Sequence, residues 1–332
     1  GDDPAEAAAA PSSKPGTQPE AKETMDIGLT RLMAEGSTAH LEESRRFNTA
    51  AGGGDQAAPD PGTPEGLRAA RSRLSRRPPD ARAVEHVAVA GTRRVPVRII
   101  APRRPPVRAT YLQIHGGGFY MDSAARSDAA NALLADAMGI AVVSIDYRLA
   151  PEHPWPAAPD DCETAALWLI ESVDDGPGPS PLIIGGASAG ANLALATLLR
   201  LRDRGQVQRF VGAVLQFGAY DLSGQSPGGR MYADEWFIRA YAGHVADRTN
   251  PDISPLYGDL GGLPPTLVMV GARDILLEDN LAMAVRLSAA GNDIDLRIYP
   301  ESPHGFTSLP TAMAAAALKG MEAWMGERLD QH

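Results

Sequence analysis

A serine flanked by glycines stands in the pentapeptide Gly186-Ala187-Ser188-Ala189-Gly190. The apolar run Leu182-Ile183-Ile184 before it is typical of the end of a buried strand, and the Ala- and Leu-rich stretch from Ala191 to Arg204 predicts a helix after it. A strand that turns this sharply into a helix crowds its neighbours, which explains the glycines. The turn would expose the Ser188 hydroxyl beside a helix N-terminus, where developing negative charge is favoured. The pattern therefore predicts a nucleophilic serine.

A serine hydroxyl is a poor nucleophile until a base takes its proton, and that base needs a group that orients it. Of the seven histidines, His304 is the best candidate, because it lies in a Gly/Pro loop directly after the last predicted strand. Asp274 follows another late strand and is the candidate acid, whereas Asp279 is predicted to be an N-terminal acid of the next helix. A loop histidine taken alone would be a surface residue. The order serine, aspartate, histidine, however, is that of α/β-hydrolases.

Backbone donors for an oxyanion are expected in His115-Gly116-Gly117-Gly118, which directly follows a predicted strand. Consecutive glycines let the backbone approach a substrate and point N–H groups at it. The N–H of Ala189, next to the serine, would add a further donor. His115 itself is predicted to be a structural hydrogen-bonding residue and not a second base.

Strands and helices alternate along most of the chain, which implies right-handed crossovers and an α/β fold with a mostly parallel sheet. Ligands bind such sheets at the carboxyl ends of the strands, where the candidate residues lie. The predicted strands are Val84 to Ala90, Val95 to Ile100, Thr110 to Ile114, Ile140 to Ile145, Leu182 to Ile184, Phe210 to Gln216, Thr266 to Gly271 and Ile294 to Tyr299. The predicted helices are Met25 to Phe47, Pro64 to Arg76, Ala124 to Met138, Pro159 to Glu171, Ala191 to Arg204, Glu278 to Ala290 and Pro310 to Leu329, with a loop from Asn48 to Pro64.

Segments outside this alternation predict the domain organisation. Residues 1–24 are rich in Pro, Ala, Ser, Lys and Glu and cannot bury enough apolar surface to offset their ordering entropy, so a disordered tail is expected. Residues 25–80 are expected to form N-terminal lid helices and a loop. The insertion at about 223–250 is too long for a simple connection and rich in aromatic residues, so it is the second lid candidate. Residues 81–332 are the predicted catalytic domain.

Composition narrows the classes of partner. The chain has 332 residues, 44% of them hydrophobic, which is ordinary for a globular protein. A formal net charge of −10 argues against nucleic acid as a partner. The single cysteine, Cys162, argues against a disulfide or a cysteine-ligated metal and is predicted to be a small buried helix residue. No apolar run approaches the ~20 residues of a membrane span, and no signal-peptide pattern is present, so a cytoplasmic location is expected.

These motifs resemble those of the hormone-sensitive-lipase-like family of α/β-hydrolases, the bacterial esterases with an HGGG motif. The similarity runs from about Thr110 to Phe306. The matching motifs are HGGGF at His115 to Phe119, DYRLAPEHPWPAAPDD at Asp146 to Asp161, GASAG at Gly186 to Gly190, ISPL at Ile253 to Leu256, GLPPTL at Gly262 to Leu267 and HGF at His304 to Phe306. Two positions depart from the family pattern: Ala191 replaces a second glycine after the serine, and Ile275 replaces a proline after the acid.

The resemblance implies an eight-stranded α/β-hydrolase sheet with a helical cap built from both lid candidates. It implies that Ser188, Asp274 and His304 form a catalytic triad. It implies that Gly117, Gly118 and Ala189 donate to the oxyanion. The segment from Tyr147 to Glu152 is expected to hold the sheet and the HGGG loop in position, without a catalytic role.

The predicted function is a serine hydrolase, without metal or cofactor, that cleaves a carboxylic ester of a short-to-medium acyl group or a small metabolite. An amine leaving group or transfer to another alcohol is left open, as is a homodimer. A binding protein without turnover is disfavoured, because plant receptors that resemble this family have replaced the triad histidine and His304 is present here. The candidate substrate contacts are Phe119, Tyr120, Tyr220, Trp236 and Phe237.

Deletion of residues 1–24 should leave ester turnover unchanged, because the predicted tail contributes no group to the site. The measurement is kcat for a p-nitrophenyl ester with and without the segment. A large loss of kcat would show that the segment is part of the working enzyme.

Overall fold

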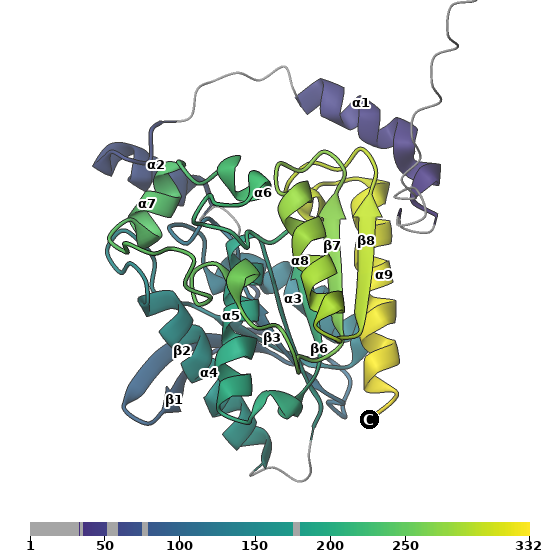
Figure 1. Cartoon of the computed structure of the whole chain (residues 1–332). Helices are drawn as coiled ribbons and strands as arrows, with labels where there is room; N and C mark the ends of the chain where they lie inside the picture. The colour runs from purple at the N-terminus through teal and green to yellow at the C-terminus, as the bar shows by residue number, and fades with distance from the viewer. Residues whose placement is uncertain (1–32, 34–35, 52–58, 75–78, 175–179) are drawn as a thin grey trace, which may run out of the picture. The chain divides into compact units, whose positions relative to one another are not determined.

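Eight strands pair side by side in one sheet, in the order β1-β2-β4-β3-β5-β6-β7-β8. Figure 1 labels β1, β2, β3, β6, β7 and β8 of this sheet. They belong to a computed structural model that describes residues 33, 36–51, 59–74, 79–174 and 180–332. β1 pairs with β2 and β2 with β4 in antiparallel fashion, and every other pair is parallel, so the predicted α/β-hydrolase sheet is confirmed. The strands are β1 Val84–Ala90, β2 Arg93–Ile100, β3 Thr110–Ile114, β4 Ala141–Ile145, β5 Leu182–Ala187, β6 Phe210–Gln216, β7 Thr266–Gly271 and β8 Ile294–Tyr299.

Helices cover both faces of this sheet. The α-helices are α1 Leu41–Ala51, α2 Pro64–Leu74, α3 Asp128–Met138, α4 Ala157–Asp174, α5 Ala189–Asp203, α6 Pro227–Arg230, α7 Trp236–Ala242, α8 Leu277–Ala289 and α9 Ala312–Leu329. Short 3-10 turns are η2 Ser37–His40, η3 Ala124–Ser127, η4 Val207–Arg209, η5 Pro255–Tyr257 and η6 Phe306–Ser308. Buried side chains of α4, α5 and α8 pack on one face of the sheet, and those of α3 and α9 pack on the other.

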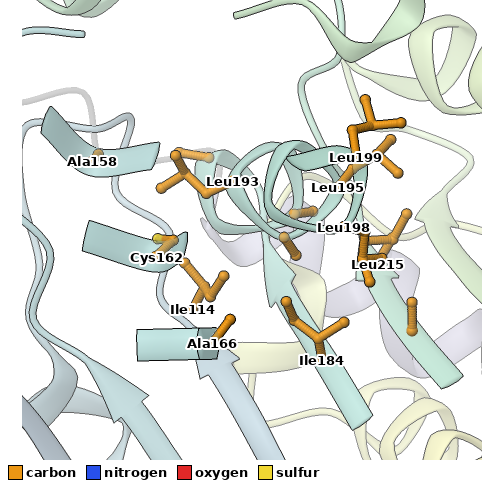
Figure 2. Close-up of a cluster of buried hydrophobic side chains, with 14 of the residues drawn as sticks. Ile114, Ala158, Cys162, Ala166, Ile184, Leu193, Leu195, Leu198, Leu199 and Leu215 are labelled. Atoms are coloured by element: carbon orange, nitrogen blue, oxygen red, sulfur yellow. The ribbon is translucent and has the colours of Figure 1, made fainter. Parts of the chain in front are cut away.

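The larger hydrophobic cluster joins α5 to the central strands and to α4. Figure 2 shows part of it, with side chains of α5, α4 and the strands in contact: Leu193, Leu195, Leu198, Leu199, Ala158, Cys162, Ala166, Ile114, Ile184 and Leu215. Each fully buried leucine contributes about 1.5–3 kcal/mol to folding. Cys162 is fully buried in α4, as predicted, and burial raises the pKa of its thiol well above the ordinary value.

The two faces of β5 carry different side chains. Leu182 and Ile184 belong to the cluster under α5, whereas Ile183 and Ala187 belong to the cluster under α3 and α9. Because side chains alternate along a strand, Gly185 lies on the same face as Ile183 and Ala187. The α3 and α9 face of β5 therefore carries no side chain larger than a methyl group at its carboxyl end.

Most predicted boundaries differ from the structure by a few residues at most. Five of the predicted strands match residue for residue, but β2 begins two residues earlier than predicted, at Arg93. Only Gly91 and Thr92 therefore lie between β1 and β2. α4 begins at Ala157, ahead of the predicted Pro159, because the first N–H groups of a helix have no partner and a proline costs nothing there.

The N-terminal helices differ more from the prediction. α1 begins at Leu41 and continues to Ala51, through the first residues of the predicted loop. The predicted tail, residues 1–24, lies outside the described residues, as do residues 25–32 of the first predicted helix. The insertion at 223–250 holds two short helices, α6 and α7.

A buried ion pair ties β2 to the start of α3. Arg98 donates from Nε and Nη2 to the two carboxylate oxygens of Asp128, at 3.1 and 2.7 Å. Arg98 is 8% exposed and Asp128 is 1% exposed. Asp128 is also the first residue of α3, where a negative charge is favoured by the helix dipole.

Arg98→Met should lower the free energy of unfolding by about 3–5 kcal/mol, because it leaves the Asp128 carboxylate buried without its cation. Arg68→Met is the matched control, since Arg68 pairs with Glu65 on the surface of α2, and it should change stability by less than about 1 kcal/mol. Urea unfolding of both variants gives the comparison. If both variants lost the same free energy of unfolding, the buried Arg98–Asp128 pair would stabilise the fold no more than a surface pair does.

Candidate active site

Ser188 lies at a sharp turn between β5 and α5. Its φ of 56° and ψ of −118° are unfavourable for a residue with a side chain. The two flanking glycines make the turn sterically feasible: a Cβ on Gly190 would lie 2.1 Å from the carbonyl oxygen of Ile114, and one on Gly186 would lie 2.5 Å from that same oxygen. The β5–α5 connection therefore presses directly on the end of β3, which explains the glycine spacing seen in the sequence.

His304 lies between Ser188 and Asp274. Its Nε2 is 3.0 Å from the Ser188 Oγ, and its Nδ1 is 2.9 Å from Oδ2 of Asp274 and 3.0 Å from Oδ1. A carboxylate can only accept, so Nδ1 carries the proton and Nε2 is left to accept from the serine hydroxyl. The structure thus brings the three predicted residues into one hydrogen-bonded row.

Two neighbouring loops position the acid and the base. Asp274 follows β7, and its Oδ1 accepts a hydrogen bond from the backbone N–H of Leu276 at 2.8 Å. The loop after β8, which carries His304, lies against the loop after β7: Arg273 N donates to Ser302 O at 3.0 Å. A Cβ on Gly271 would lie only 2.0 Å from that same oxygen, so the contact requires glycine.

The glycine-rich loop after β3 lies beside Ser188. Gly117 has a φ of 100° and Gly118 a φ of 58°, conformations that glycine adopts at little cost. Among the described residues, none accepts a hydrogen bond from the N–H of Gly117 or of Gly118. Ala189 is the first residue of α5, so its N–H has no acceptor within the helix. These three N–H groups are those predicted to receive an oxyanion.

Tyr147 contacts the backbone of the glycine-rich loop. The Tyr147 hydroxyl lies 2.9 Å from the carbonyl oxygen of His115 and 3.1 Å from that of Gly116. The His115 ring stacks on the Tyr147 ring at 4.2 Å, and its Nδ1 lies 2.7 Å from the Gly116 carbonyl oxygen. Burial lowers the pKa of His115, which keeps the ring neutral. His115 is a structural residue in this geometry, as the sequence predicted.

Arg71 of α2 contacts the residues that follow this loop. Its Nε donates to the carbonyl oxygen of Tyr120 at 2.8 Å, and its Nη2 donates to that of Ala150 at 3.0 Å. Glu152 accepts from both Nη atoms at 2.8 Å, and this contact with Arg71 lowers the pKa of Glu152 to about 2. The sequence analysis did not identify Arg71, because no local pattern reports a contact between residues so far apart in the chain.

Ser188 and His304 open into a cavity of about 900 Å³. Three of the five predicted substrate contacts line it: Phe119, Tyr120 and Phe237. The other two lie elsewhere. Tyr220 is fully buried in the core, and Trp236 packs edge-on against Tyr120 with ring centroids 5.0 Å apart. Phe237 lies over the glycine-rich loop, since a Cβ on Gly118 would come within 3.3 Å of its ring.

Asp279 lies in the first turn of α8, as predicted, and is 1% exposed. Its Oδ2 accepts hydrogen bonds from the Tyr232 hydroxyl at 2.6 Å and from the backbone N–H groups of Tyr220 and Asp221. Tyr232 belongs to the 223–250 insertion and lines the cavity. Asp279 therefore positions a wall of the cavity. Burial raises its pKa to about 6, although these hydrogen bonds act in the opposite direction.

Comparison with known proteins identifies the class. A family model described as the alpha/beta hydrolase fold matches residues 111–308. The carboxylic ester hydrolase LipN of Mycobacterium tuberculosis is 33% identical over 231 residues, 65% of this chain and 61% of the length of LipN. An acetyl-hydrolase of Streptomyces hygroscopicus is 34% identical over 214 residues, 62% of this chain and 70% of its own length. The chain therefore spans less than two thirds of LipN.

Solved structures narrow the class further. An esterase of Pyrobaculum calidifontis has a TM-score of 0.72 at 28% identity, covering 79% of this chain and 92% of that one. EstE7, described as a homologue of hormone-sensitive lipase from a metagenome library, has a TM-score of 0.71 at 29% identity. The match covers 87% of this chain and 98% of EstE7. The chain belongs to the α/β-hydrolase superfamily and, within it, to the hormone-sensitive-lipase-like esterases. It is a hydrolase of the carboxylesterase type.

Two further findings concern the described residues alone. None of their helices combines the length and the apolar character needed to cross a lipid bilayer. Nor do three or more His, Cys, Asp or Glu side chains gather there in an arrangement that could hold a metal ion.

Asp279→Asn should become more stable relative to the wild type as the pH rises from 4 to 7. The folded-state pKa of about 6 exceeds the ordinary value of 3.8, so Asp279 stabilises the fold only while protonated. That contribution is present below pH ~4 and is lost as the pH passes ~6, a change of about 3 kcal/mol that asparagine does not undergo.

Urea unfolding at pH 4, 5.5 and 7 measures this difference. Asp203→Asn, which removes an exposed carboxylate at the end of α5, is the matched control. A stability difference between Asp279→Asn and the wild type that stays flat, or falls with pH, would contradict the raised pKa.

Proposed function

We propose that the chain hydrolyses a small carboxylic ester through an acyl-enzyme on Ser188. The observation that carries the proposal is the position of His304, 3.0 Å from the serine hydroxyl on one side and 2.9 Å from Asp274 on the other. In this arrangement a weak nucleophile has a base within reach, and the base has a buried carboxylate that fixes its orientation and stabilises its charged form.

In the first half of the reaction the Ser188 Oγ attacks the ester carbonyl carbon while His304 Nε2 takes the hydroxyl proton. The carbonyl oxygen becomes an oxyanion, which accepts from the N–H groups of Gly117, Gly118 and Ala189. His304 then gives its proton to the leaving alkoxide oxygen, and the alcohol departs. Loss of a single oxyanion donor costs roughly 3 kcal/mol in other hydrolases.

In the second half a water molecule attacks the acyl carbon. His304 Nε2 takes a proton from this water and returns it to the Ser188 Oγ as the acyl–oxygen bond breaks. The carboxylic acid leaves, and the serine hydroxyl is restored. Asp274 accepts from the Nδ1–H throughout and does not itself take the proton.

We further propose that the N-terminal helices and the 223–250 insertion act together as a cap over the cavity, next to the catalytic domain at 81–332. Three contacts support this: Arg71 of α2 contacts the residues that follow the glycine-rich loop, Phe237 of α7 lies over Gly118, and Trp236 lies 3.0 Å from the position of a Cβ on Gly62. A short-to-medium acyl group fits the volume of the cavity, and the acetyl-hydrolase name of one relative agrees with it.

The cytoplasmic location and the homodimer stay predictions. Cell fractionation would test the first. Light scattering on the purified chain would test the second.

Ser188→Ala should abolish turnover of p-nitrophenyl acetate and butyrate, since it removes the hydroxyl on which the proposed acyl-enzyme forms. Ser172→Ala, on the exposed side of α4, is the matched control and should retain wild-type rates. Asp274→Asn should lower kcat by about 10³–10⁴-fold, as expected when the base loses its orienting carboxylate. Asp279→Asn should be much milder, because Asp279 does not contact His304.

Steady-state kinetics of the four variants gives the answer. Retained activity in Ser188→Ala would overturn the acyl-enzyme mechanism. A greater loss of kcat in Asp279→Asn than in Asp274→Asn would overturn the assignment of the acid.

A further inference from the structure

Tyr111 of β3 lies on the lining of the cavity that contains Ser188. Its side chain belongs to the hydrophobic cluster under α3 and α9 and is 3% exposed. The ring extends from β3 over the neighbouring strand β5, where the hydroxyl lies 2.5 Å from the position of a Cβ on Gly185. Any side chain at that position would displace the hydroxyl. Gly185 therefore leaves the space that Tyr111 fills.

The Tyr111 hydroxyl is unpartnered and can be reached from the cavity. No residue that the structure describes donates a hydrogen bond to it or accepts one from it. The hydroxyls of Tyr220 and Tyr241 also lack a partner there, but they are sealed inside the protein, whereas the Tyr111 oxygen is not. Burial raises the pKa of Tyr111, so the hydroxyl keeps its proton. Tyr111 thus offers a hydrogen-bond donor to a bound ligand, and a buried donor left without an acceptor is costly.

The side-chain amides on the described part of the cavity lining do not compete for this role. Gln113 lies two residues further along β3, and its Oε1 is sealed from the cavity, so only its Nε2–H groups can meet a ligand. Asn131 of α3 donates from Nδ2 to Ser144 Oγ at 2.7 Å. Gln216 of β6 accepts from Thr307 Oγ1 at 3.0 Å. The side-chain groups beside the Tyr111 hydroxyl therefore favour a ligand that accepts hydrogen bonds.

The charge of the cavity favours an uncharged acceptor. Asp122, Glu235 and Glu322 place three carboxylates on the lining, and burial raises the pKa of Glu322. Among the described residues of the lining, Arg126 is the only arginine or lysine, and it pairs with Asp122 at 3.3 Å. A free carboxylate on the substrate would be repelled by these groups, whereas a carbonyl oxygen brings no charge.

We propose that Tyr111 determines specificity by selecting esters that carry a second, uncharged carbonyl group. Its hydroxyl donates to the oxygen of that carbonyl, while the apolar side chains of Leu134 and Met321 line the space beside it. This inference rests on the proposed function, because it describes the substrate on which Ser188 acts.

The geometry of β5 limits where the second carbonyl lies in the substrate. Gly185 and Ser188 are three residues apart, so their Cα atoms are separated by at most about 10 Å. A hydrogen bond of about 2.8 Å to the Tyr111 hydroxyl takes up part of this distance. A chain of roughly three to five carbon–carbon bonds between the two carbonyl carbons fits the rest, which corresponds to a 4-oxo, 5-oxo or 6-oxo acyl group.

Matched p-nitrophenyl esters test the proposal on the full chain. The pairs are pentanoate with 4-oxopentanoate, hexanoate with 5-oxohexanoate, and heptanoate with 6-oxoheptanoate. A further pair, pentyl butyrate with 4-oxopentyl butyrate, places the carbonyl on the alcohol. Each ratio of kcat/KM is divided by the ratio for hydroxide-catalysed hydrolysis of the same pair. The wild type should prefer the oxo ester by about tenfold in at least one pair, equivalent to about 1.4 kcal/mol, and that pair shows which half of the ester reaches Tyr111.

Tyr111→Phe removes only the hydroxyl and should bring this ratio to about one. Tyr299→Phe is the matched control, because Tyr299 is also 3% exposed in the same hydrophobic cluster but is not on the cavity lining. It should keep the wild-type ratio. The p-nitrophenyl ester of 5-hydroxyhexanoate separates the two directions of the hydrogen bond, since its hydroxyl can donate and a ketone can only accept.

The outcomes separate this inference from the function on which it rests. A wild type that hydrolyses none of the plain esters fails the proposed function itself. Turnover of the plain esters without preference for an oxo ester in any pair overturns the inference alone, and this result needs no variant. A preference that Tyr111→Phe leaves intact overturns it as well. So does a preference for 5-hydroxyhexanoate over hexanoate that 5-oxohexanoate does not share, because the cavity would then be selecting a donor.

Discussion

The contact between the β5–α5 turn and the end of β3 is the constraint on which the site depends. Gly186 and Gly190 both approach the carbonyl oxygen of Ile114 more closely than any side chain could. That contact fixes Ser188 in an unfavourable backbone conformation and sets it beside the glycine-rich loop that continues from β3. The same backbone contact therefore positions both the nucleophile and the proposed oxyanion donors. Because the buried side chains of α5 anchor the turn, the strain at Ser188 is offset by the hydrophobic core.

Hydrogen bonds between residues far apart in the sequence also restrain the segments around the site. Tyr147 binds two carbonyl oxygens of the glycine-rich loop, and Arg71 of α2 binds the residues that follow this loop. Asp279 connects α8 with Tyr232 on the cavity wall. These groups touch no substrate in the proposed mechanism, yet each restrains a backbone segment or side chain that does. A carboxylate such as Asp279 is costly to bury, and three hydrogen bonds to one of its oxygens offset part of that cost.

The sequence predicted those features of the fold and the site that depend on neighbouring residues in the chain. Five strands match residue for residue because β-rich apolar runs end at glycine, proline or polar residues, and Ser188, Asp274 and His304 could be found because each follows such a strand. Long-range contacts left weaker signals. Tyr220 looked like a substrate contact but is enclosed in the core, and Arg71 has no motif around it.

The Arg71 contact has a consequence for how the site forms in time. The residues of the site lie between Arg71 in α2 and His304 after β8, so they are synthesised at widely separated times. A growing chain already contains Ser188 and its glycines when more than a hundred residues still separate it from its base. The hydrolytic centre thus cannot form on a partly synthesised chain, and a half-made enzyme would contain an unreactive serine.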